Sequence, residues 1–345
     1  FPPALVPAVE PTIEPDAMLI ALDRESSKSY RQFVELAWPV LEPSTPFVPN
    51  WHIDALCDIL EAVARFQITR LVINIPPGCM KSWLVSKAFI PWVWGPFGQP
   101  TRRSINASYV DALSIRDSVD ARAIITSPWY QARWPLTLSD DQDTKHKFLN
   151  AQRGFRMAIP RGGGTGEHAH HITIDDPHPT DPKKQESEEA VKDVHDWWEK
   201  TMSSRGVGET ETTRVICMQR LPLTPVDLSG HVLRPDAPEP YELVCFPMEY
   251  EPTRIVDRNL PMRARPPSAI PSPLATGFVD PRVDEGELLW PAQHSPAFVH
   301  AQKTTLGTFE YVGQYQERPA PREGGIIKRA WLRYWHALPN PADVT

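Results

Sequence analysis

The chain has 345 residues, enough for one large or two modest domains with a substantial core. Its formal charge is −7, which excludes a general attraction to nucleic-acid phosphates, so any DNA contact must be local or shared among subunits. No apolar run approaches the roughly 20 residues that span a bilayer, and we expect no membrane partner. The cysteines form no CxxC pair, which argues against a zinc site and fits reduced thiols.

The N-terminal region, residues 1–50, is expected to form an arm, because its first 16 residues and residues 41–50 are rich in proline. From Trp51 the chain changes character. Ile53, Leu56, Leu60 and Val63 recur at helical spacing, which predicts an amphipathic helix with one apolar side.

Residues 51–250 alternate short apolar runs with helical patterns. This alternation predicts a mostly parallel sheet with helices on both faces. We expect the helix that begins at Lys81 to end or kink at Pro91. Strands are expected at 71–75, 102–109, 155–160, 171–175, 213–219 and 242–247, and further helices at 110–127 and 184–204.

Residues 251–345 form a third region of different character. Residues 251–287 are crowded with proline and arginine and have little periodicity, which indicates irregular structure. Residues 295–316 have a helical pattern, with a break at Gly307.

Residues 70–82, RLVINIPPGCMKS, have the order of a phosphate-binding loop: a strand, a Pro/Gly turn and the start of a helix. In such a loop, here residues Pro77, Gly78, Cys79, Met80, Lys81 and Ser82, the backbone N–H groups from Gly78 onward face the phosphates, and Pro77, which has no N–H, belongs to the turn. Lys81 would place a charge on the outer phosphates, and Ser82 would offer its hydroxyl to Mg²⁺. The alternative is an ordinary strand and helix N-terminus that carry Lys-Ser.

A second motif, HHITIDDP at 170–177, reads as a strand that ends in two carboxylates. Asp175 would hold Mg²⁺, and Asp176 would orient or activate the attacking water. An Asp pair after a strand is also common in helix caps and turns. Because both motifs occur in the expected order, we interpret them together as a nucleoside-triphosphate site.

A basic stretch covers residues 145–161 without an intervening acid. It is the best local candidate for a DNA or phosphate contact, and a solvated basic face is the alternative. Its basic residues are Lys145, Lys147, Arg153, Arg156 and Arg161.

Several segments in order resemble one family, the large terminase subunit, the motor that packages DNA into tailed-phage and prophage capsids. The similar segments include WH at 51–52, INIPPGCMKS at 73–82, residues 107–135, GTGEHAHHITIDDP at 164–177, residues 216–231 and residues 306–335. The resemblance implies an α/β P-loop NTPase of the additional-strand (ASCE) type, followed by a lid or linker subdomain at 251–345. In the family a nuclease domain comes next, and we expect no nuclease metal site in this chain.

The resemblance also assigns roles to individual residues. Lys81 and Ser82 match the phosphate-loop pair, Asp175 the Mg²⁺-binding Asp, and Asp176 the catalytic carboxylate, where many relatives have Glu. Gln219 matches the position that senses the γ-phosphate. Its neighbour Arg220 could contact phosphate or pair with an acid.

Trp51 and His52 match the segment just upstream of the ATP site. An adenine could stack on Trp51, and the alternative is that Trp51 anchors the start of its helix in the core.

Two departures from the family pattern stand out. Met80 replaces the usual Gly before the lysine, and Glu167 stands where relatives often have an arginine finger. We take Arg161 as the substitute finger, with an ordinary turn arginine as the alternative; Arg116 and Arg122 are weaker candidates.

The function implied by the resemblance is an ATPase that uses ATP and Mg²⁺ to translocate double-stranded DNA. Such a motor would self-associate into a ring on the portal protein, work with the small terminase subunit, and act in the host cytoplasm, docked on the procapsid. One alternative is a decayed prophage protein that keeps the fold as a non-hydrolysing binding scaffold. A helicase-like remodelling ATPase is a third possibility. It is disfavoured because residues 307–335 resemble the terminase linker, with no helicase-like second motor domain expected behind them.

Overall fold

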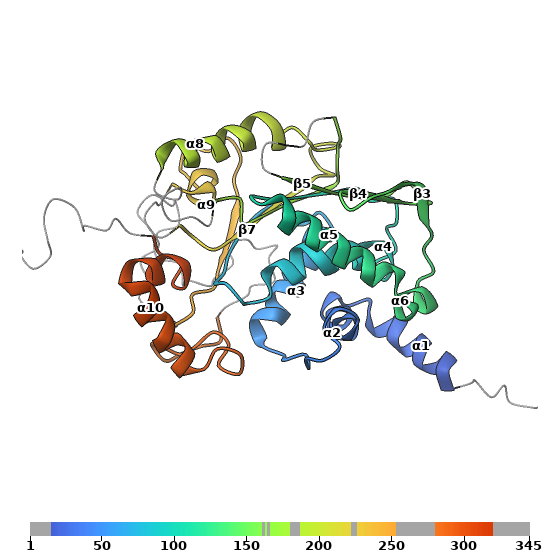
Figure 1. Ribbon diagram of the computed structural model, residues 1–345, viewed down its shortest axis with the longest axis horizontal. Helices are drawn as coiled ribbons and strands as arrows, with labels where there is room; N and C mark the ends of the chain where they lie inside the picture. The colour runs from blue at the N-terminus through green and yellow to red at the C-terminus, as the bar shows by residue number, and fades with distance from the viewer. Residues whose placement is uncertain are drawn as a thin grey trace, which may run out of the picture.

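The computed structural model describes residues 15–160, 163, 166–179, 187–221, 226–252 and 280–319. They form an eight-stranded sheet in the order β3-β4-β5-β2-β6-β7-β1-β8 (Figure 1). All the pairings from β5 to β8 are parallel, and β3 and β4 add an antiparallel edge. The strands are β1 (Arg70–Asn74), β2 (Ser104–Ser108), β3 (Leu138–Asp143), β4 (Lys147–Asn150), β5 (Phe155–Pro160), β6 (His171–Asp175), β7 (Thr213–Met218) and β8 (Glu242–Cys245).

Helices cover both faces of the sheet, as the alternating pattern predicted (Figure 1). One core packs α2, α3, α4, α5 and the π-helical stretch η1 against the sheet, and a second core packs α8, η2 and α9 against the opposite face. The helices are α1 (Pro15–Ser26), α2 (Tyr30–Leu41), α3 (Trp51–Ala64), η1 (Trp83–Ala88), α4 (Phe89–Trp94), α5 (Asp111–Thr126), α6 (Pro128–Arg133), α8 (Glu188–Trp197), η2 (Trp198–Met202), α9 (Leu228–Val232) and α10 (Pro296–Gln314).

The central strands β6 and β7 are buried along their whole length. Strand β7 ends in an apolar run at residues 215–218, whereas β6 alternates Ile172 and Ile174 with polar residues that are also buried. Strand β7 lies between β1 and β6, with Leu71 opposite Val215 and Asp175 opposite Cys217. Because the three strands are parallel, the loop after β1, the carboxylates after β6 and the residues after β7 emerge at the same edge. We call this the carboxyl edge of the sheet.

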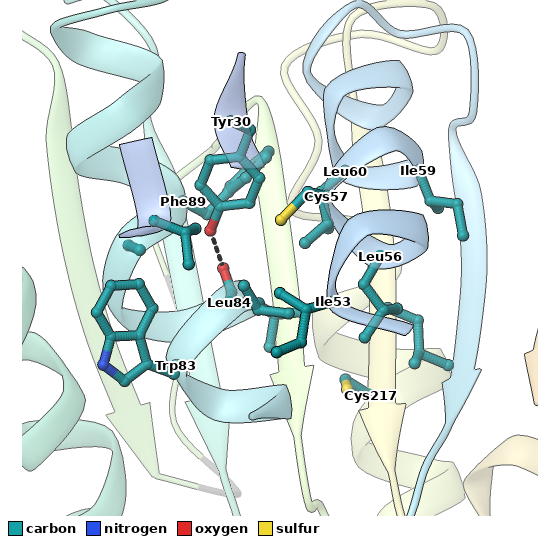
Figure 2. Close-up of a cluster of buried hydrophobic side chains, with 14 of the residues drawn as sticks. Tyr30, Ile53, Leu56, Cys57, Ile59, Leu60, Trp83, Leu84, Phe89 and Cys217 are labelled. Carbon is teal, nitrogen blue, oxygen red and sulfur yellow. Dashed lines mark hydrogen bonds between the residues drawn. The ribbon is translucent and has the colours of Figure 1, made fainter. Parts of the chain in front are cut away.

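The segment expected as an N-terminal arm contributes α1 and α2. Figure 2 shows the ring of Tyr30, from α2, beside α3 and the helix that follows β1. Tyr30 is fully buried, its ring contacts Phe89 edge-on at 6.0 Å, and its hydroxyl donates to the carbonyl oxygen of Leu84. These contacts fasten α2 to the helix that carries Lys81.

The sequence predicted that Pro91 ends or kinks its helix. The helix does not end at Pro91. The helix continues to Trp94, and the irregularity comes earlier, in the π-helical stretch η1. Pro91 is the third residue of α4, and α4 follows this stretch directly.

Residues 280–319 pack beside the sheet and include α10, which has the expected break at Gly307, where φ is 78°. The N–H of Met248, after β8, donates to Tyr315, and the N–H of Leu289 donates to Met248. No helix in the described part of the chain is long and apolar enough to cross a membrane.

We expect the buried ring of His171, at the start of β6, to make the fold less stable at acidic pH. The ring is buried, stacks on Phe66 at 5.6 Å and contacts the hydroxyl of Thr213 at 2.9 Å. Burial, helped by nearby Arg102, lowers the pKa of His171 from 6.5 to about 3. As the pH falls below 6.5 the unfolded chain takes up a proton that folded His171 refuses, so at pH 5 His171 should cost about 2 kcal/mol of stability.

Urea unfolding at pH 7.5 and pH 5 would measure this effect. Wild type should lose more stability between the two values than His171→Phe does, by about 2 kcal/mol. Equal losses in the two proteins would mean that His171 is protonated in the folded state.

Candidate functional site

The loop between β1 and its helix has the backbone of a tight, strained turn. Gly78 has a φ of 76° and Met80 a φ of 63°, so two residues adopt the left-handed conformation. A Cβ on Gly78 would lie 3.1 Å from the ring of His294, which shows how closely the segment before α10 approaches the loop. Met80 thus has the conformation for which glycine is usual, although it is a larger residue.

The conformation at Met80 predicts an inverted order of stability for two variants. Alanine normally stabilises relative to glycine because it restricts the unfolded chain, but a left-handed alanine carries a strain that glycine lacks. Both variants lose the packing of the Met80 side chain against the core. We therefore expect Met80→Gly to be more stable than Met80→Ala by about 1 kcal/mol in urea unfolding. The opposite order would show that the loop does not hold this conformation in solution.

Lys81 is buried at the carboxyl edge and pairs with Asp176, with 2.7 Å between Nζ and Oδ2. Although burial lowers it, the carboxylates of Asp176 and Asp175 raise the pKa of Lys81 above its usual value. Lys81 therefore carries its charge. The two halves of the predicted site, which lie 95 positions apart, meet in this ion pair.

Asp175, the last residue of β6, is held from the helix after the loop. Its Oδ2 accepts a hydrogen bond of 3.1 Å from Ser86, and Ser82 also bonds the carboxylate. Burial and the adjacent Asp176 raise the pKa of Asp175 to about 7, against the opposing effects of Lys81 and Ser82. Its buried Oδ1 has no hydrogen-bond partner among the described residues. Two neighbouring carboxylates with one ammonium, an unpaired oxygen and a serine hydroxyl fit a hard divalent cation such as Mg²⁺.

Asp176 also contacts the end of β7. Its own φ is 46°, and its Oδ1 accepts a bond of 3.3 Å from the N–H of Gln219. The backbone of Gln219 therefore lies beside the carboxylate. A role for Gln219 as a γ-phosphate sensor stays a prediction.

Arg220 is accounted for by acids of this chain. Its side chain is buried and pairs with Asp227, with the closest contact at 2.8 Å, and its backbone N–H donates to Glu317 at 2.8 Å. Glu317 follows α10, so the residue next to Gln219 is bonded directly to the segment expected as a lid.

His52 is a buried, neutral histidine of the core. Burial lowers its pKa to about 3, and its ring lies 5.2 Å from that of Trp290. Trp51 is partly buried, packs on Phe246 and has the guanidinium of Arg282 5.3 Å from its ring centre. A role for Trp51 and His52 toward adenine stays a prediction.

The remaining sequence predictions concern the candidate arginine fingers and the basic stretch at 145–161. Arg161 lies outside the described residues. Glu167 pairs with Lys147 at 2.5 Å, and Arg116 pairs with Asp117 at 2.8 Å. The basic stretch is divided, because Arg156 is fully buried and donates to the carbonyl of Ser86, whereas Lys145 and Arg153 are exposed.

Sequence reasoning missed two residues that contact the site. Ser86 lies one helical turn after Ser82, so its spacing on the same helix face could have identified it. His294 comes from a distant segment and gives no local signal, since only the tertiary fold brings it to Gly78.

Comparison with known proteins gives a likeness of fold and no match of sequence. No protein-family model matches the sequence, and no curated protein matches it. Among solved structures, the chain is similar to one described as the crystal structure of the HK97 bacteriophage large terminase. The two share 14% identity with a TM-score of 0.41, over 60% of this chain and 40% of that one. The match therefore spans less than half of the length of the terminase and concerns the fold alone.

Proposed function

We propose that this chain is the ATPase part of a DNA-packaging motor of the large-terminase type. The observation that carries the proposal is the convergence of Lys81, Asp175 and Asp176 at the carboxyl edge, after a loop with left-handed Gly78 and Met80. Ligands of open α/β sheets collect at this edge. Strand β7, between the loop strand and the carboxylate strand, fits the additional-strand P-loop NTPases.

In this proposal ATP and Mg²⁺ bind between the loop and Asp175. Ser82 and Asp175 would hold the cation, which would neutralise charge on the phosphates. On ATP binding, Lys81 would leave its ion pair with Asp176 and pair with the outer phosphates instead. The exchange frees the Asp176 carboxylate to orient the attacking water, so binding and activation are linked through one ion pair.

The same proposal gives Gln219 and the lid a coupling role. Asp176 is bonded to the N–H of Gln219, and the N–H of the next residue is bonded to Glu317 after α10. A shift of Gln219 when the γ-phosphate leaves would therefore be passed to residues 311–319 through two hydrogen bonds. Movement of that segment is the step that would be coupled to displacement of double-stranded DNA.

The motor would assemble as a ring on a portal protein in the host cytoplasm, docked on the procapsid, with a small terminase subunit as a further partner. Arg161 is our candidate for an arginine that acts on the nucleotide of the neighbouring subunit. Glu167, at the usual finger position, is paired with Lys147 and offers no cation.

ATP turnover with and without duplex DNA and portal tests the proposal. We expect slow turnover alone and stimulation by both. Mixing Arg161→Ala with Asp176→Asn isolates the action of the arginine, since a mixed ring contains interfaces with both groups intact and should regain part of the activity. Absence of turnover under every condition would favour a binding scaffold, and absence of rescue would reject Arg161.

A further inference from the structure

A polar pocket opens at the opposite edge of the sheet from Lys81. Its volume is about 820 Å³. Arg103 and His170 immediately precede β2 and β6, and Phe155 begins β5, so the pocket lies at the amino ends of the parallel strands. Lys147 from β4 and Arg153 from the turn before β5 complete its basic wall. We call it the amino-edge pocket.

Its charges are unbalanced. Three cations, Arg103, Lys147 and Arg153, face one carboxylate, Glu167, which is engaged by Lys147 at 2.5 Å. The guanidinium groups of Arg103 and Arg153 make no hydrogen bond or ion pair with the described residues. Burial, together with Arg102 and Arg103, lowers the pKa of His170 to about 4, consistent with a positive potential at this place.

The turn that carries Arg153 is rigid. The side chain of Asn150 donates to Pro100 at 2.7 Å and accepts from the N–H groups of Gln152 and Gly154 at 2.9 and 3.0 Å. A Cβ on Gly154 would lie 2.0 Å from the carbonyl oxygen of Pro100, so only glycine fits there. Arg153 itself is left-handed, with a φ of 70°. The arginine is thus presented on a fixed backbone, which reduces the entropy lost when it binds a ligand.

We propose that the amino-edge pocket binds phosphate groups of a nucleic-acid backbone. Arginine forks match phosphate oxygens, and Thr101 and Ser139, which also line the pocket, carry hydroxyls of the kind that donate to phosphate at such contacts. Arg103 and Arg153 come from different segments, before β2 and before β5, which suits successive phosphates of a nucleic-acid strand. The chain has a net charge of −7, so it can bind a polyanion only through a local group of basic residues such as this pocket.

This inference rests on the proposed function. It places DNA binding and ATP hydrolysis at opposite edges of the sheet. Strands β2, β5 and β6 run from the pocket to the carboxyl edge, roughly 16 Å for a five-residue strand. His170 precedes β6 and Asp175 ends it, so one strand connects the phosphate pocket with the proposed cation ligand.

Fluorescence anisotropy with a labelled duplex, at several salt concentrations and without ATP, tests the pocket. Arg103→Gln and Arg153→Gln should each weaken binding roughly 5- to 20-fold and make the salt dependence shallower by about one unit of slope. Glu167→Gln should act in the opposite direction and tighten binding, because it releases Lys147. Lys192→Gln, an exposed lysine of α8 outside the pocket, is the matched control and should change little.

Because the arginine variants should weaken DNA binding and Glu167→Gln should tighten it, misfolding cannot account for the whole pattern. A damaged fold would not bind more tightly. Unchanged affinity in both arginine variants, or in Glu167→Gln, would overturn the inference. Full competition by inorganic phosphate or tripolyphosphate at equal phosphate concentration would identify a small-anion site and also overturn it. If ATP turnover is absent but the variants behave as stated, only the proposed function fails; if DNA-stimulated turnover persists in the double arginine variant, only this inference fails.

Discussion

Lys81→Ala is expected to lower ATP turnover by roughly 10²–10³-fold or more. Lys81 is the only ammonium that contacts the Asp176 carboxylate among the described residues, and it is charged and buried at the point where the loop and the carboxylates meet. Its removal leaves the outer phosphates without a fixed positive charge and Asp175 and Asp176 without their cation. We therefore expect weaker nucleotide binding and a slower chemical step.

Lys87→Gln is the matched control. Lys87 belongs to the same helix, but it pairs with Asp120 at 2.6 Å on α5 and does not contact the loop. Its variant should keep turnover within a few-fold of wild type, with a modest loss of stability. Circular dichroism and thermal unfolding would confirm that both variants are folded. If folded Lys81→Ala hydrolyses ATP as fast as wild type, the assignment of the loop is wrong.

Asp176→Asn is expected to separate binding from hydrolysis. The substitution removes the carboxylate that would orient the water, which should lower turnover by roughly 10²–10⁴-fold. It also removes the group that competes with phosphate for Lys81, so ATP affinity should be equal to that of wild type or a few-fold tighter. Equilibrium binding of a fluorescent ATP analogue and steady-state turnover would measure the two effects independently.

The neighbouring carboxylate should behave differently. Asp175→Asn removes the proposed cation ligand, and its amide can still accept from Ser86 and Ser82. We expect its ATP affinity to become weaker in Mg²⁺ and nearly insensitive to Mg²⁺ concentration. If the two aspartate variants have the same profile, with binding and turnover lost in parallel, the division of roles between Asp175 and Asp176 is incorrect.

The sequence predicted the central strands and the site edge well, for a physical reason. Strands buried on both faces have apolar runs such as the one in β1, and the residues that follow parallel strands must emerge together. The meeting of Lys81 with Asp176 and the place of Gln219 follow from that rule. The break at Gly307 was also visible, because glycine interrupts a helical pattern there.

Other features depend on contacts that no local pattern contains. Strands β3 and β4 were not expected, because β3 is polar and β4 has only four residues. The π-helical stretch η1 depends on packing, with Tyr30 and Arg156 bonding the carbonyls of Leu84 and Ser86. Arg156 looked like part of a basic surface, but its position in β5 turns it into the core. The sequence could not show that Glu167 pairs with Lys147, since the two residues are 20 positions apart and no local pattern brings them together.

Calorimetric titration of ATP into the chain, with and without Mg²⁺, tests the central claim most directly. We predict one site per chain, binding that strengthens with Mg²⁺ in wild type, loss of most affinity in Lys81→Ala and loss of the Mg²⁺ effect in Asp175→Asn. No binding by wild-type protein, or binding that is unaltered in both variants, would contradict a nucleotide site formed by this loop and these carboxylates.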